Sequence, residues 1–114
     1  MIEKIVYQYL SGALDVPVYI GEKPTNKPSE YIVLEVIDGG RVNMIDAVTF
    51  NCESYSTTLL KAAELNKKVK DAMYNIVSLP QVSSSKCGGG GQNIDTQTKS
   101  YCYEAIFNLY YMEE

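Results

Sequence analysis

A strand pattern that runs straight into a helix pattern occupies the middle of the chain and limits the folds open to it. From Ala47 to Tyr55 apolar and polar residues alternate, so that Val48, Phe50 and Cys52 fall on one side of a strand. This alternation is typical of an antiparallel strand that buries one face. The segment therefore predicts a sheet strand followed by a helix that packs against the sheet, and it carries no obvious reactive group.

A long helix is predicted to begin near Thr57, with Ser56 or Thr57 as its N-cap residue. Its buried side is indicated by apolar residues at helical spacing, namely Ala62, Leu65, Val69, Ala72, Met73 and Ile76. Its other side is charged and carries Lys61, Glu64, Lys67, Lys68, Lys70 and Asp71. We interpret the charged side as solvated, since a helix face of mixed charge is usual at a protein surface. Pro80 is expected to end the helical region.

Other segments predict strands on both sides of this unit. Tyr31–Asp38 is rich in β-branched residues, which indicates a buried strand, and Tyr101–Tyr111 alternates like a half-buried one. One face of the latter is formed by Tyr103, Ala105, Phe107 and Leu109. Val16–Ile20 predicts a short strand, and Pro17 indicates a strand start or a sheet edge there, because it cannot donate a ladder hydrogen bond. Gln81–Lys86 is a further candidate strand.

The N-terminal segment predicts a short amphipathic helix that ends at about Gly12. Apolar residues recur there at helical spacing: Ile2, Ile5, Val6, Tyr9 and Leu10. A chain of 114 residues suits one domain with one core. We therefore predict an α+β fold that forms a single compact domain over residues 1–114. Its mixed, mostly antiparallel sheet is expected to pack against the short N-terminal helix and one long central helix.

Composition argues against several classes of function. The chain has no His, which removes the commonest general base and the commonest metal ligand. Its net charge is −4 and Arg41 is its only Arg, whereas binding to nucleic-acid phosphates needs clustered Lys and Arg. No signal peptide and no membrane-spanning segment is expected. The three cysteines suggest no disulfide framework, so we expect buried reduced thiols at Cys52 and Cys102 and a surface thiol at Cys87.

No catalytic, cofactor-binding or metal-binding residue is predicted. The glycine run Gly88–Gly91 lacks the Lys and the Ser or Thr that complete a phosphate-binding loop. Glu35 and Asp38 are expected to point to opposite faces of one strand, so they form no metal site with the nearby Glu30. Cys87 has no His to activate it as a nucleophile.

Two glycine-containing segments are instead predicted to be mobile loops that a partner orders. The sequence Asp38-Gly39-Gly40 indicates a turn, and the loop is expected to extend to Asp46. The four glycines from Gly88 to Gly91 give the backbone great freedom and predict a hairpin tip within Lys86–Gln92. The candidate assembly-interface residues are Asp38, Gly39, Gly40, Arg41, Asn43, Gly88, Gly89, Gly90 and Gly91.

Three pieces of the chain carry a resemblance to a known family. They are the segment VPVYIGEKPTNKPSEYI, the sequence ESYS that enters the Ala-rich helix, and the aromatic strand at the end. With the order of elements, they resemble the tail terminator proteins of long-tailed bacteriophages. These are also called tail completion or tail-to-head joining proteins, and minor capsid or minor tail proteins. The resemblance covers nearly the whole chain.

The resemblance implies a structural virion protein of a phage or prophage. It implies a homohexameric ring that caps the tail tube and offers the surface to which the filled head attaches. The implied partners are further copies of the chain, the tail tube protein and a head-completion or connector protein. DNA passes through the lumen of such a ring without specific binding. The resemblance implies no enzyme activity, no cofactor and no membrane partner, and it places the protein in the phage tail, and in the host cytoplasm during assembly.

Two other classes of function stay open at this point. One is a bacterial adaptor or binding domain that recognises a partner peptide by strand addition at the edge Val16–Ile20. Ring formation under mild conditions would argue against that class. The other is a small enzyme that uses the Cys87 thiol or the carboxylates between Glu30 and Asp38. Thiol titration and a metal screen would test it.

Overall fold

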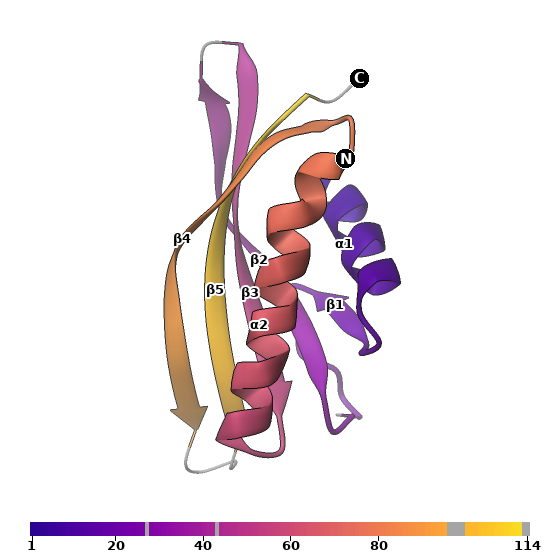
Figure 1. Cartoon of the computed structure of the whole chain (residues 1–114), viewed down its shortest axis with the longest axis vertical. Helices are drawn as coiled ribbons and strands as arrows, with labels where there is room; N and C mark the ends of the chain where they lie inside the picture. Colours follow the sequence, from indigo (N-terminus) through magenta and orange to yellow (C-terminus); the bar gives the residue numbers. More distant parts are fainter. Residues whose placement is uncertain (27, 43, 96–99, 113–114) are drawn as a thin grey trace.

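One five-stranded sheet carries the fold, and both α-helices lie on the same side of it (Figure 1). The computed structural model describes residues 1–26, 28–42, 44–95 and 100–112, without the side chains of residues 42, 95 and 100. In chain order the elements are α1 (Ile2–Ala13), β1 (Val18–Ile20), β2 (Tyr31–Val42), β3 (Ile45–Ser56), α2 (Leu59–Asn75), the 3-10 helix η1 (Ile76–Ser78), β4 (Val82–Asp95) and β5 (Ser100–Tyr111).

The strands are arranged in the order β1-β2-β3-β5-β4. β1 runs parallel to β2, and the other neighbours are antiparallel. The predicted α+β class, with a mixed and mostly antiparallel sheet, a short N-terminal helix and a long central one, is confirmed. β1 lies at the edge of the sheet, as Pro17 led us to expect, and the carbonyl oxygen of Pro17 accepts a hydrogen bond from the N–H of Ile32 at 2.9 Å.

The core lies between the sheet and the helix layer. The predicted apolar stripe of α2 packs there, and Leu65, Val69 and Met73 are buried. Phe50 on β3 is paired directly with Phe107 on β5, and both rings are buried in the same cluster. The alternation in the middle strand is therefore confirmed, since its apolar side faces the helices.

The start of α2 differs from the prediction. Thr58, rather than Ser56 or Thr57, is the N-cap residue, and its side-chain oxygen accepts a hydrogen bond from the N–H of Lys61 at 3.1 Å. Ser56 is still part of β3, where it pairs with Tyr101. The ladder to β5 therefore holds Ser56 in the strand, and the helix begins only after that pairing ends.

The predicted turn at Asp38-Gly39-Gly40 is wrong. β2 continues to Val42, and Gly39 and Gly40 pair with Val48 and Ala47 on β3. The chain reverses close to Met44, which has a positive φ of 69°. The backbone freedom of a glycine pair is compatible with a turn, but here β3 supplies ladder partners for both glycines. Asn43 lies outside the described residues.

The predicted hairpin tip at Gly88–Gly91 is also wrong. These glycines lie inside β4, where Gly89, Gly90 and Gly91 pair with β5. Gly90 has a φ of +135°, and a Cβ atom at this position would overlap the carbonyl oxygen of Glu104. A Cβ atom at Gly88 would lie 2.6 Å from Nδ2 of Asn108. The absence of side chains at these two positions lets β4 approach β5 closely.

Candidate assembly surfaces

The hairpin formed by β2 and β3 extends beyond the helix layer at one end of the molecule (Figure 1). We call its described residues 36–42 and 44–49 the hairpin arm. Four of the candidate interface residues lie together on it: Asp38, Gly39, Gly40 and Arg41. The N–H of Gly39 donates to Oδ1 of Asp38 at 2.8 Å, and Nε of Arg41 donates to Oδ1 of Asp46 at 3.1 Å. With part of β3 they line a shallow hollow of about 210 Å³.

Apolar side chains are exposed on the hairpin arm. Met44 is 85% exposed, and Val36, Ile37 and Ile45 also lie at the surface. The predicted buried strand from Tyr31 is buried only as far as Leu34, because residues 35–41 are exposed. Exposed apolar residues that gather at one place mark candidate contact sites.

The remaining candidate residues, Gly88 to Gly91, do not join the arm. They lie on β4 at the far edge of the sheet, with β3 and β5 between them and β2. The structure therefore divides the predicted interface into two separate places, and neither is a loop.

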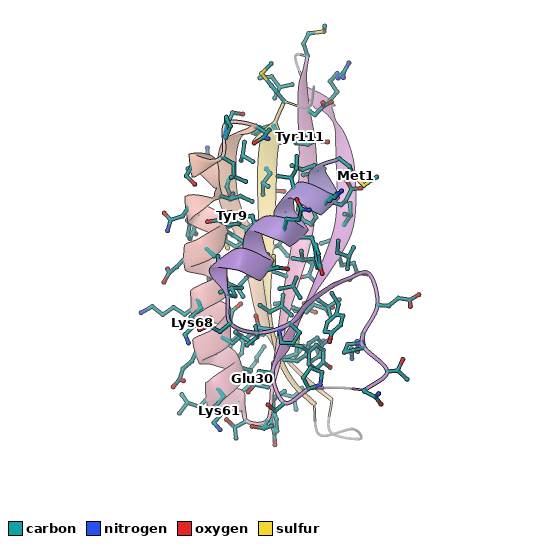
Figure 2. All side chains as sticks on the ribbon, turned by 90° about the vertical axis from the view of Figure 1, so that its right-hand side faces the viewer. Met1, Tyr9, Glu30, Lys61, Lys68 and Tyr111 are labelled. Carbon is teal, nitrogen blue, oxygen red and sulfur yellow. The ribbon has the colours of Figure 1, made fainter. Side chains whose placement is uncertain are left out.

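A groove of about 580 Å³ lies between α1 and α2. The hydroxyl of Tyr9 donates to the carbonyl oxygen of Ala72 at 2.7 Å, which ties the two helices together along it. Figure 2 shows Tyr9, Glu30, Lys61 and Lys68 on this side of the molecule. Oε2 of Glu30 also accepts a hydrogen bond from the hydroxyl of Ser56 at 3.1 Å. The groove lining mixes both signs of charge with an apolar floor and includes no Cys.

The placement of the carboxylates corrects one prediction. Glu35 pairs with Asn51 and Asp38 pairs with Thr49, so Glu35 and Asp38 share one face of the sheet. A register shift between Val36 and Asp38 cancels the expected alternation, because a bulge adds one residue to one strand. Glu30 is separate from both, since it lines the groove on the helix side. Among the described residues, no group of three or more His, Cys, Asp or Glu side chains is placed to hold a metal ion.

Acidic side chains face each other on the side of the sheet away from the helices. We call Glu35, Asn51, Glu53 and Glu104 the acidic band. Glu53 is paired directly with Glu104, and Asn51 directly with Glu35. Burial raises the pKa of Glu53, and the charges of Glu104 and Glu35 raise it further, against a hydrogen bond from Tyr55 and the charge of Lys23. Sequence reasoning missed this band, because only the strand register brings its members together.

Aromatic rings cover one end of the same sheet face. Tyr31 is stacked on Tyr55, with ring centroids 4.7 Å apart, and Tyr19 meets Tyr31 edge-on at 6.2 Å. The ammonium of Lys23 lies 4.7 Å from the centre of the Tyr55 ring. This cluster, which also buries Cys102, is a small second core on the face without helices.

Two of the three thiols are chemically protected by the fold. Cys52 and Cys102 are buried and free, as predicted. Burial raises the pKa of both thiols to about 12, so that neither forms a thiolate near neutral pH. Cys87 is only half-buried, and its thiol donates to the carbonyl oxygen of Gly89 at 3.5 Å.

We expect one thiol per folded chain to react quickly with a disulfide reagent at neutral pH. That thiol is Cys87, because its sulfur is partly accessible whereas Cys52 and Cys102 become reactive only on unfolding. Colorimetric titration with and without denaturant measures this difference. Cys87→Ser should remove the fast reaction and leave the urea midpoint unchanged. A fast-reacting thiol in the folded Cys87→Ser variant would show instead that Cys52 or Cys102 is accessible.

Comparison with known proteins supplies no family for the chain. No protein-family profile matches it, and no curated protein matches it either. Among the described residues, no helix is both long enough and apolar enough to cross a membrane.

Proposed function

We propose that this chain is a structural virion protein that caps the tail tube of a long-tailed phage or prophage as a ring. In this proposal the ring, a homohexamer by family resemblance, also provides the surface to which the filled head attaches. Its partners are further copies of itself, the tail tube protein and a head-completion or connector protein. It acts in the phage tail, after assembly in the host cytoplasm, and has neither an enzymatic nor a membrane role.

The hairpin arm is the observation that carries the proposal. It projects past the helix layer and exposes Met44, Ile37 and Val36 to solvent (Figure 1). The β2 residues 36–41 of the arm are exposed, so the apolar side chains there gain a favourable environment only against another protein. Net charge supports the same proposal, since an acidic chain lets DNA pass through a ring lumen without binding it.

We expect the chain to form closed rings on the ends of tail tubes. Sedimentation and native mass measurement of the protein alone and with purified tail tubes test this expectation. The ring is expected with tubes even if the free protein is monomeric, because the tube end presents several binding sites in a circle. A monomer in both settings would overturn the proposal.

A binding domain that works by strand addition is the second candidate. The edge expected for this role, at Val16–Ile20, offers only the three residues of β1. The other edge of the sheet is β4, which runs for 14 residues from Val82 to Asp95. A long edge strand presents unpaired backbone groups to a partner strand. A peptide partner recovered on β4, with no ring on tail tubes, would favour this candidate over the ring.

A further inference from the structure

The acidic band contains like charges that face each other across two strands. Glu53 and Glu104 are direct partners on β3 and β5, and such a pair destabilises a sheet. Glu35 adds a third carboxylate, and its charge contributes to raising the pKa of Glu53. A single polar substitution would remove this repulsion between carboxylates. Unfavourable local interactions of this kind are expected where a protein meets a partner.

An unpaired acceptor lies in the same band. Asn51 is only 8% exposed, and its Oδ1 atom has no hydrogen-bond partner within the described part of the chain. Buried side-chain oxygens are nearly always paired in folded proteins. Asn51 shares its side of β3 with Glu53, so an unpaired acceptor and the carboxylates lie on the same part of the sheet.

One cation, Lys23, lies near the band beside the Tyr55 ring and acts on Glu53, and further cations lie on the opposite layer of the same molecule. α2 carries four lysines, and within the described residues none of them forms an ion pair; the ion pair found there is Arg41–Asp46. Lys61 and Lys68 line the groove beside Glu64 and Asp71. Lys67 and Lys70 are three residues apart, which places them together on the other flank of α2. Glu64 lies three residues before Lys67 and Asp71 lies four residues after it, so the outer side of α2 carries four lysines against two carboxylates and has a net positive charge.

We propose that the acidic band binds Lys67 and Lys70 of a second copy of this chain. The helix layer of one subunit then covers the open sheet face of the next. This inference rests on the proposed function, because it names the contact that joins neighbouring subunits of the ring. An ammonium group has three donors, enough to bridge the carboxylates of Glu53 and Glu104.

The position of the two surfaces determines the kind of assembly. The band is on the face of the sheet without helices, and α2 is on the other face. One copy therefore uses a different surface from the one that its neighbour offers, which makes the contact heterologous. Heterologous contacts produce rings when the rotation between subunits closes. They also give the sheet a second helix layer, which is a stable arrangement for a sheet.

Charge reversal on each side tests the contact. In one full-length variant Glu35 and Glu104 are replaced (E35K and E104K), and in another Lys67 and Lys70 are replaced (K67E and K70E). Glu53, whose pKa is raised by burial, is left unchanged. Self-association on tail tubes at low ionic strength should be at least tenfold weaker for either variant alone. A mixture of both variants should recover association to within a few-fold of wild type, since each supplies the charge that the other lacks.

A matched control for the E35K/E104K variant carries the same change in net charge elsewhere. Glu3→Lys with Asp15→Lys alters α1 and the segment after it, and it should associate like wild type. Circular dichroism and urea midpoints verify that every variant is folded. If the E35K/E104K variant associates like wild type, or if mixing restores nothing, a second copy does not occupy the band. If wild-type protein forms no ring on tubes, the ring function itself fails, and this result is distinct from the first two.

Discussion

Phe107→Ala should lower the free energy of unfolding by about 3–5 kcal/mol, the range typical of truncating a buried aromatic side chain. Phe107 is fully buried and pairs with Phe50 across the two central strands. Tyr74 on α2 meets its ring edge-on, with centroids 5.1 Å apart. The substitution therefore opens a cavity between the sheet and α2, at the centre of the main core. Urea unfolding followed by circular dichroism measures the change.

Tyr110→Ala is the matched control for this prediction. It removes an aromatic ring from the same strand, but Tyr110 is 40% exposed and lies on the face away from the helices. Its effect should be much smaller, because part of the ring is already in water. A Phe107→Ala midpoint close to that of wild type would show that the packing of α2 on β5 is not the main source of stability.

Gly90→Ala should destabilise the protein by at least about 2 kcal/mol, even though it adds a single methyl group. Two effects combine: φ at this position is +135°, and the new Cβ atom would overlap the carbonyl oxygen of Glu104. Backbone strain and overpacking each contribute about 1–3 kcal/mol. The pairing of β4 with β5 should loosen, which hydrogen exchange across Gly88–Gly91 and a lower urea midpoint would both detect.

Gly40→Ala provides the comparison. Its φ is outside the left-handed region and the space around it is open, so the substitution should be close to neutral or stabilise by up to about 1 kcal/mol. If Gly90→Ala were equally harmless, β4 would not be held against β5 at this point. The glycine run would then behave as the free hairpin tip that the sequence alone suggests.

Much of the architecture could be predicted because it depends on short-range periodicity. The alternation of Val48, Phe50 and Cys52 and the helical stripe that includes Leu65, Val69 and Met73 each determine which side is buried. Pro17 predicted a strand start or a sheet edge from its missing N–H donor. These signals are properties of the residues themselves, and they persist whatever the rest of the chain does.

The two glycine segments show where such reasoning ends. Gly39, Gly40 and the run from Gly88 to Gly91 permit either a turn or an extended strand, since glycine restricts neither. The choice was made by neighbours distant in sequence, because β3 and β5 supply partners for their backbones. Where the local propensity favours neither a turn nor a strand, tertiary pairing decides the conformation.

The acidic band of the candidate site likewise depends on pairing between distant segments. The sequence by itself determined the α+β class, the faces of the strands and the absence of His, and it placed Glu53 and Glu104 on outward sides of their strands. Only the tertiary structure decided that they oppose each other, and that Glu35 and Asp38 share a face. The physical reason is that strand register and bulges depend on pairing between separate segments of the chain, such as those of Glu53 and Glu104, and no local pattern contains their relative alignment.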